Sequence, residues 1–163
     1  MTDNNAPVAV DRAVAEPGET NIRDSTDDGP DRAVRAMIEA DTASRLLGIQ
    51  VVTLDPGHVT MQMTVLPSML NGHGTCHGGY LFLLADSAFG AACNSVAGGA
   101  AAVASSCDVT FVAPAWAGDV LQAEACERLS FGRSGLFDVT VRRADGTVMV
   151  EFRGHSRRLP APP

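Results

Sequence analysis

Asp86 is the residue of this sequence best placed to do chemistry, because it is a lone carboxylate within a long apolar run. It stands between Ala85 and Ser87, and the run itself extends over about residues 80–93. Burying a carboxylate costs free energy unless the group is paired or takes part in a reaction. A bond to a serine or to the backbone of a neighbouring strand is the structural alternative. The position of Asp86 on a helix that begins directly after a glycine-rich loop favours a role as general base or nucleophile.

The loop before this run supplies a second kind of chemical group. Residues 71–79 read NGHGTCHGG, and His77, Gly78 and Gly79 stand where the helix would begin. Glycines at a helix start leave the first backbone N–H groups uncovered, and the helix dipole favours negative charge there. These N–H groups could stabilise an oxyanion on a carbonyl under attack. A glycine pair required only by a tight turn is the structural alternative.

The spacing of Gly78 and Asp86 bears on how such a site would be built. The two residues are eight positions apart on one predicted helix, which is about 12 Å along its axis. One substrate carbonyl cannot contact both from the same helix. If both act on one carbonyl, they come from different chains, and the site is shared across a two-fold dimer interface.

Cysteine and histidine side chains near the loop raise two other possibilities. His73, Cys76, His77 and Cys93 contain metal-ligating atoms, but their spacing matches neither a zinc finger nor a His-Glu-x-x-His helix. No metal is therefore expected at the loop. Cys76 beside His77 is a possible nucleophile. Adjacent side chains in a turn generally point apart, so this arrangement ranks below Asp86.

Three further polar residues are candidates for substrate contacts. Asn71 could orient a water molecule through its amide, although loop asparagines more often shape turns. Arg133 and Ser134 stand in a predicted loop, where an arginine fork suits phosphate recognition. A solvated turn arginine is the alternative.

Apolar periodicity predicts the elements that position these groups. The predicted helices cover residues 31–47, with Asp31 as cap and Gly48 as stop, and about 78–97. The predicted strands cover residues 49–55, 58–65, 101–111, 119–129, 135–143 and 148–155. Turn signals at 56–57 and 145–146 predict hairpins. The order predicts an α+β domain over residues 31–158, with a mostly antiparallel sheet curled round one buried helix. Residues 1–30 are predicted to be a disordered acidic tail, and 159–163 a frayed C-terminus.

Charge and composition narrow the functional classes. Residues 1–31 have a net charge of −6 and residues 32–163 of −1, while residues 128–158 have a net charge of +4 and the chain has no lysine. A basic patch on a near-neutral domain suits a small phosphorylated ligand better than nucleic acid. No apolar run of membrane-spanning length and no secretory signal is visible, so we expect no membrane partner and a cytoplasmic protein. The four cysteines form no Cys-x-x-Cys pair and are expected to be reduced.

Residues 71–79, together with LADSAF at 84–89 and ACNS at 92–95, closely resemble the phenylacetic-acid-degradation, or PaaI-type, thioesterases of the hotdog-fold superfamily. Weaker strand matches extend the resemblance over about residues 32–158. The resemblance implies a sheet wrapped round one long helix, paired into homodimers and commonly homotetramers. It implies hydrolysis of acyl-CoA thioesters, with aryl-acetyl groups such as phenylacetyl or hydroxyphenylacetyl, and no cofactor beyond the CoA of the substrate.

The resemblance also implies roles for individual residues. Asp86 corresponds to the catalytic base or nucleophile, and the Gly78 N–H to the group that polarises the thioester carbonyl. Asn71 would help to position the thioester or water, and His77 would lie at the site. Gly79, Arg133 and Ser134 would bind substrate, the last two through CoA. A non-catalytic acyl-CoA-binding hotdog domain and a hotdog enoyl-CoA hydratase remain open as alternatives.

Overall fold

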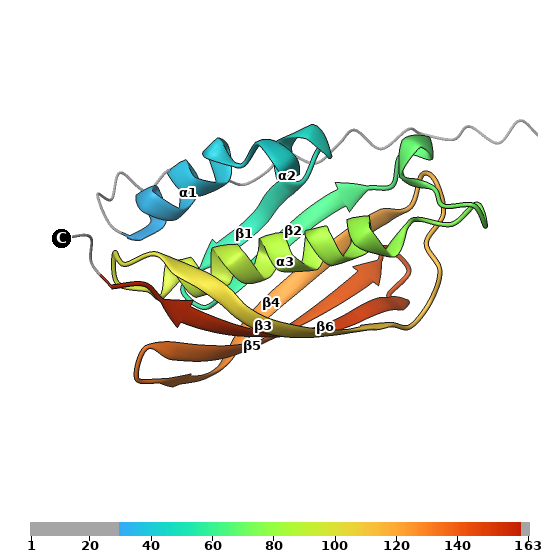
Figure 1. The fold of residues 1–163 in the computed structure, drawn as a ribbon. Coiled ribbons are helices and arrows are strands. Elements are labelled where there is room, and N and C mark those ends of the chain that lie inside the picture. Colours follow the sequence, from blue (N-terminus) through green and yellow to red (C-terminus); the bar gives the residue numbers. More distant parts are fainter. Residues whose placement is uncertain (1–29, 161–163) are drawn as a thin grey trace, which may run out of the picture.

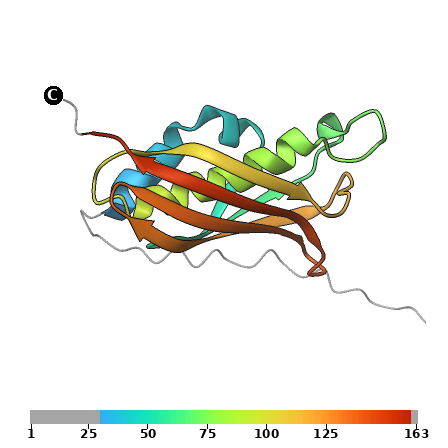
Figure 2. The same ribbon diagram turned by 60° about the horizontal axis from the view of Figure 1, so that its bottom comes forward.

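The computed structural model describes residues 30–160, which form a six-stranded sheet wrapped round one long helix (Figures 1 and 2). Almost all of the predicted acidic tail and the last three residues lie outside the described range. The helices are α1 (Pro30–Ala40), α2 (Thr42–Leu46) and α3 (Gly78–Ser95), with a short 3-10 turn at Pro67–Met69. The strands are β1 (Gln50–Asp55), β2 (His58–Thr64), β3 (Ala102–Phe111), β4 (Val120–Phe131), β5 (Ser134–Arg143) and β6 (Val148–Arg158).

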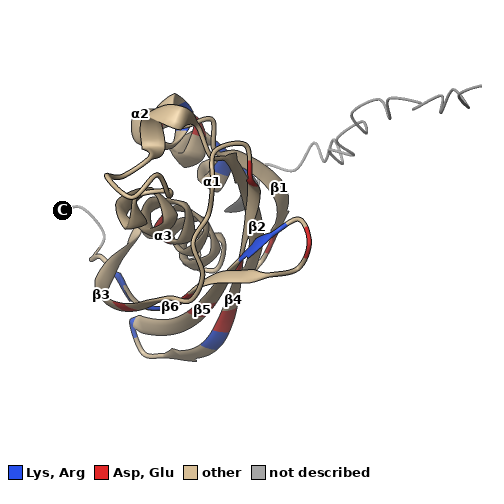
Figure 3. Cartoon of the chain, turned by 90° about the vertical axis from the view of Figure 1, so that its right-hand side faces the viewer, with Lys and Arg blue, Asp and Glu red and all other residues tan. Residues whose placement is uncertain are grey.

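The strands form one sheet in the order β1-β2-β4-β5-β6-β3, and every pairing is antiparallel. The view along the molecule shows α3 inside the curve of the sheet, with α1 and α2 packed beside it (Figure 3). The predicted α+β class and the single enclosed helix are confirmed. Among the described residues, no helix is both long and apolar enough to cross a membrane.

Helix α3 is buried because its apolar residues face the sheet along most of its length. Leu84, Ala85 and Ala88 are completely buried, and Phe89 is 1% exposed. The Phe89 ring makes edge contacts with Phe137 at a centroid distance of 5.6 Å. It also lies against the backbone of β6, where a Cβ on Gly154 would come within 2.7 Å of the ring. The absence of a side chain at residue 154 therefore lets α3 approach the sheet closely.

Most strands show the alternation expected of a sheet with one buried face. Inward residues of β2, β5 and β6 are buried and the residues between them are more exposed. The two predicted hairpins are present. Gly57 and Gly146 adopt positive φ angles of 71° and 86° in their turns, a conformation that glycine adopts without steric strain.

The predicted single helix over residues 31–47 is wrong in one respect, because it is broken into α1 and α2 at Asp41. The Asp41 side chain accepts hydrogen bonds from the Ser44 N–H at 3.1 Å and from the Ser44 hydroxyl. Asp41 has an extended backbone and is the N-cap of α2. A short side chain that bonds the backbone ahead of it competes with helix continuation. The chain therefore turns at Asp41 and starts a new helix.

Strand β3 differs from the others because it ends the sheet and is exposed on both faces. Within the described chain only β6 pairs with it, and most of its residues are exposed. Val103 is 44% exposed and Phe111, its last residue, is 51% exposed. An exposed edge strand with apolar side chains is a surface on which another chain can pair.

Candidate active site

The glycine-rich loop is fixed at both ends before it enters α3. The Cys76 N–H donates to the carbonyl of Ala115 and the His77 N–H to the carbonyl of Met69, both at 2.8 Å. Cys76 also forms an isolated bridge with Leu70. The first bond holds the start of α3 against the loop between β3 and β4, and the second holds it against the 3-10 turn at Pro67–Met69.

The Asn71 side chain closes the loop on itself. Its Oδ1 accepts from the His73 N–H at 2.8 Å and from the Thr75 N–H at 3.3 Å. Its Nδ2 donates to the Thr75 hydroxyl at 3.0 Å. Asn71 therefore has the turn-shaping role that is common for loop asparagines. The second hydrogen on Nδ2 is left for a water molecule or a substrate.

His77 is the N-cap of α3, and its side chain engages one of the two candidate oxyanion donors. Its Nδ1 accepts a hydrogen bond from the Gly79 N–H at 3.0 Å. The Gly78 N–H, in contrast, has no acceptor among residues 30–160. Of the pair Gly78 and Gly79, only Gly78 therefore presents a free backbone donor.

Glycine is needed at position 78 because the Phe111 side chain lies close to it, and not because a turn requires a positive φ. Neither Gly78 nor Gly79 has a positive φ. A Cβ on Gly78 would lie 3.0 Å from Cζ of Phe111, whose ring covers this position from the end of β3. Glycine at 78 thus allows the end of the edge strand to lie against the start of α3.

Asp86, in the middle of α3, is partly buried and has no hydrogen-bond or ion-pair partner among the described residues. Burial raises the pKa of its carboxyl group. The neighbouring Ser87 is bonded instead to the Ser44 hydroxyl of α2 at 2.8 Å. The structural alternative for Asp86, a bond to a serine or to a strand backbone, is therefore not realised.

The Asp86 side chain lies on the wall of a cavity of about 540 Å³ between α3 and the α1–α2 pair. Met37, Ile38, Ile49 and Met61 supply apolar parts of the wall. The volume is within the range of small-molecule sites. The sequence analysis did not identify these wall residues. The apolar face of the predicted helix over 31–47 was the available signal, but its partner surface could not be assigned.

The cysteines near the site have raised pKa values. Burial, followed by the charge of Asp86, raises the pKa of Cys93 to about 12 and also raises that of Cys107. Burial raises the pKa of Cys76, which is 5% exposed. A buried neutral thiol is a poor nucleophile, so the structure favours Asp86 over Cys76.

Arg133 and Ser134 lie away from Gly78 in the same chain. They border a small hollow at the C-terminal end of α3, next to Cys93 and Ala97. The Arg133 guanidinium donates to the carbonyl of Arg158 at 2.8 Å. The structure therefore does not bring these two residues together with the start of α3 within one chain.

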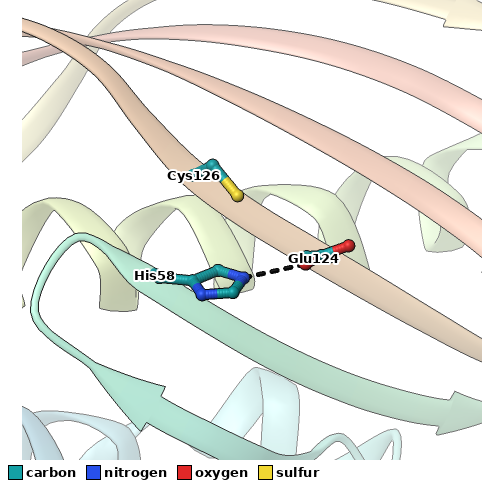
Figure 4. A group of neighbouring side chains, drawn as sticks. All are labelled: His58, Glu124 and Cys126. Atoms are coloured by element: carbon teal, nitrogen blue, oxygen red, sulfur yellow. Dashed lines mark hydrogen bonds and ion pairs between the residues drawn. The ribbon is translucent and has the colours of Figure 1, made fainter.

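The potential metal-ligating residues of the glycine-rich loop form no cluster in the described part of the chain. Within residues 30–160, the one group of three ligand side chains close to one another is His58, Glu124 and Cys126, on the sheet (Figure 4). Sequence reasoning missed this group, because strands β2 and β4 are far apart in the chain and their register is not visible in the sequence.

Comparison with known proteins adds independent evidence. The profile of the Thioesterase superfamily matches residues 73–150, a segment that contains Gly78 and Asp86. The acyl-coenzyme A thioesterase PaaI of Escherichia coli (strain K12) is 44% identical over 124 residues, which are 76% of this chain and 87% of that protein.

Solved structures agree with this assignment. The structure of E. coli PaaI, from the phenylacetic acid degradation operon, has a TM-score of 0.77 at 42% identity and covers 80% of this chain and 94% of that one. A point mutant of the phenylacetic acid degradation protein PaaI from Thermus thermophilus has a TM-score of 0.69 at 36% identity, covering 73% of this chain and 100% of that one. With this fold, this glycine-rich helix start and these relatives, the chain belongs to the PaaI-type thioesterases of the hotdog-fold superfamily.

Proposed function

We propose that this protein hydrolyses acyl-CoA thioesters to the free acid and CoA at a site shared between two copies of the chain. The observation that carries the proposal is the carboxylate of Asp86, which is partly buried, has no partner within residues 30–160 and lies on a cavity wall. The similarity to the E. coli acyl-coenzyme A thioesterase PaaI supports the same reaction.

The two catalytic groups act on one thioester carbonyl. The Asp86 carboxylate removes a proton from water, and the oxygen attacks the carbonyl carbon. The Gly78 N–H of the partner stabilises the oxyanion, an effect of about 3–4 kcal/mol by analogy with the removal of other oxyanion donors. The C–S bond then breaks, and the thiolate takes the proton from Asp86. Direct attack by Asp86 gives an anhydride that water hydrolyses to the same products.

The arrangement requires at least a homodimer. Gly78 and Asp86 lie on the same helix about 12 Å apart, so each copy would supply a base to one site and a donor to the other. The exposed edge strand β3 is the surface that we propose for pairing. We further propose a homotetramer, in line with the family resemblance. Light scattering coupled to size exclusion measures the number of copies directly.

The proposed acyl group is aryl-acetyl, such as phenylacetyl or hydroxyphenylacetyl. The apolar parts of the cavity beside Asp86 suit an aromatic ring.

We propose that Gly79, Arg133, Ser134 and Asn71 contribute to substrate binding, and that no further cofactor is needed. We place the reaction in the cytoplasm, because the four cysteines are all unpaired.

Release of free thiol from a series of aryl and fatty acyl-CoAs tests the proposal. Asp86→Ala should lower kcat by about 1,000-fold, within the range for loss of a positioned general base. The other carboxylates on the cavity wall are Glu39 on α1 and Asp41, and Asp41 is bonded to Ser44. Ser87→Ala, which changes the adjacent residue, should retain most activity. Activity should also fall in acid, with a midpoint above the pKa of an ordinary aspartate, because burial raises the pKa of Asp86.

Three results would contradict the assignment. Near-normal thiol release by the Asp86→Ala variant would exclude the proposed base. Tight acyl-CoA binding without thiol release by the wild type would instead indicate a binding domain, and hydration of crotonyl-CoA without thiol release would indicate a hydratase.

A further inference from the structure

A second group of chemically capable side chains lies on the outer face of the sheet, away from α3. His58 begins β2, and Glu124 and Cys126 are two residues apart on β4, so their side chains share one face. The strand register pairs His58 directly with Cys126. Val59, which follows His58, and Ala125, which separates Glu124 from Cys126, are fully buried on the opposite face.

The three side chains converge in space. His58 Nε2 and Glu124 Oε1 are 2.8 Å apart, and the ligand atoms of all three residues lie within 4.8 Å of one another (Figure 4). Two ligands on one tetrahedral zinc ion lie roughly 3.3–3.8 Å apart, given bond lengths of about 2.0–2.3 Å. The His58 and Glu124 side chains are about half exposed, so small rotations can bring the cluster to this geometry.

Carboxylates and arginines both surround this position. The charged groups near the Cys126 thiol are Glu124, Asp138 and Arg128. The Arg153 guanidinium donates two hydrogen bonds to Asp138, at 2.7 and 3.0 Å, and Arg128 lies 3.3 Å from the same carboxylate. Because Asp138 pairs with both arginines, Glu124 supplies the carboxylate for a metal ion.

We propose that His58, Glu124 and Cys126 form a zinc site that joins β2 to β4, with water as the fourth ligand. Imidazole nitrogen, carboxylate oxygen and thiolate sulfur are the three ligand types that zinc takes in proteins. Binding releases the Cys126 proton to solvent, and zinc replaces the hydrogen bond between His58 and Glu124, so that neutral imidazole and carboxylate each give one ligand atom to the metal. The site is on the face of the sheet opposite α3 and is separate from the proposed catalytic groups.

Titration of the metal-stripped full-length protein with zinc chloride, followed by calorimetry, tests the site. We expect one ion per chain with a Kd in the micromolar range or tighter, and a higher Tm when zinc is present. Cys126→Ser is nearly isosteric and should weaken binding by about tenfold or more. His58→Ala should weaken binding similarly and remove the zinc-dependent rise in Tm.

A matched control and a spectroscopic signal make the test specific. Cys107→Ser removes an exposed thiol on β3 and should leave zinc affinity unchanged. Cobalt bound to the wild type should give a thiolate-to-metal charge-transfer band that Cys126→Ser abolishes and Cys107→Ser preserves. Thiol release from acyl-CoA should be unaffected by Cys126→Ser, so this test is independent of the proposed hydrolysis.

Three results would overturn the proposal. They are the absence of zinc binding to the wild type at micromolar concentrations, equal affinity in Cys126→Ser, and loss of the cobalt band in Cys107→Ser. Far-ultraviolet circular dichroism of each variant without metal verifies that it is folded.

Discussion

The Asp86 carboxyl group is neutral more easily in this fold than in an unfolded chain, because burial raises its pKa. The folded state therefore binds the Asp86 proton more tightly than the unfolded state does. This favours folding at pH values below the pKa of an unfolded aspartate, about 3.9. The advantage is lost as pH rises through the higher folded-state pKa, so at neutral pH the ionised group opposes folding.

Replacing Asp86 with asparagine should therefore raise stability while removing activity. We expect Asp86→Asn to have a higher Tm than the wild type at neutral pH, because no charge is then buried. The difference should shrink in acid, where the wild-type carboxyl group is also neutral. Thermal unfolding at several pH values, with the exposed Asp55→Asn as control, measures this. A lower Tm at neutral pH would mean that the ionised carboxylate has a stabilising partner.

At the scale of the element, the start of α3 depends on His77 as a cap. The Nδ1 atom can accept from the Gly79 N–H only when it carries no proton, so the bond requires neutral imidazole. An N-cap side chain contributes roughly 0.5–2 kcal/mol to a helix. His77 thus has a structural role whether or not it also contacts substrate.

Substitution at His77 separates capping from catalysis. His77→Ala should lower the free energy of unfolding by roughly 0.5–2 kcal/mol, and His77→Asn, a good capping residue, should restore most of it. If capping is the main role, thiol release should follow stability and return in His77→Asn. Urea unfolding and steady-state kinetics on both variants provide the measurement. An inactive but fully stable His77→Asn would assign His77 to the reaction itself.

Local patterns predicted most elements well, because their signals lie within a few residues. The apolar run indicated α3, and alternating strands with glycine turns indicated the hairpins. The break at Asp41 followed from a side-chain bond to Ser44 that the apolar periodicity of residues 31–47 obscured. Asn71 has the turn-shaping role that is common for loop asparagines, because its amide oxygen accepts hydrogen bonds from its own loop. Asp86 could be identified from the sequence because an isolated carboxylate conflicts with its surroundings.

At the scale of the whole molecule, the proposed site depends on two chains, and mixing inactive variants tests this. Proline at the first helical position removes the Gly78 N–H and is tolerated there. A Cβ at 78 would crowd Phe111, so each protein carries Phe111→Ala. Asp86→Ala and Gly78→Pro should each be inactive in this background.

Mixed dimers of the two variants contain one complete site. With random exchange, half of the dimers are mixed, so an equal mixture should recover about a quarter of the activity of the Phe111→Ala parent. Thiol release after co-refolding measures the recovery, and light scattering verifies that the subunits assemble. A mixture that stays inactive although dimers form would place both groups of each site in one chain.

Features that depend on long-range register could not be predicted from the sequence. The order β1-β2-β4-β5-β6-β3 brings β2 beside β4, and this neighbourhood creates the cluster of His58, Glu124 and Cys126. The cavity wall likewise joins α1 to β1 and α3. Both features arise from tertiary contacts between segments whose individual patterns specify only their own secondary structure.

The bare backbone at Gly154 also constrains how the sequence can change over time. Phe89 lies one turn from Asp86 on α3 and seats that helix on β6. A side chain at 154 would push the helix, and the Asp86 carboxylate with it, away from the sheet. A lineage that acquires alanine at 154 therefore needs a smaller residue at 89 and a shift of the Phe152 ring, which would lie 2.9 Å from the new Cβ. Positions 89 and 154 should consequently covary among descendants of this gene, although neither is among the proposed catalytic residues.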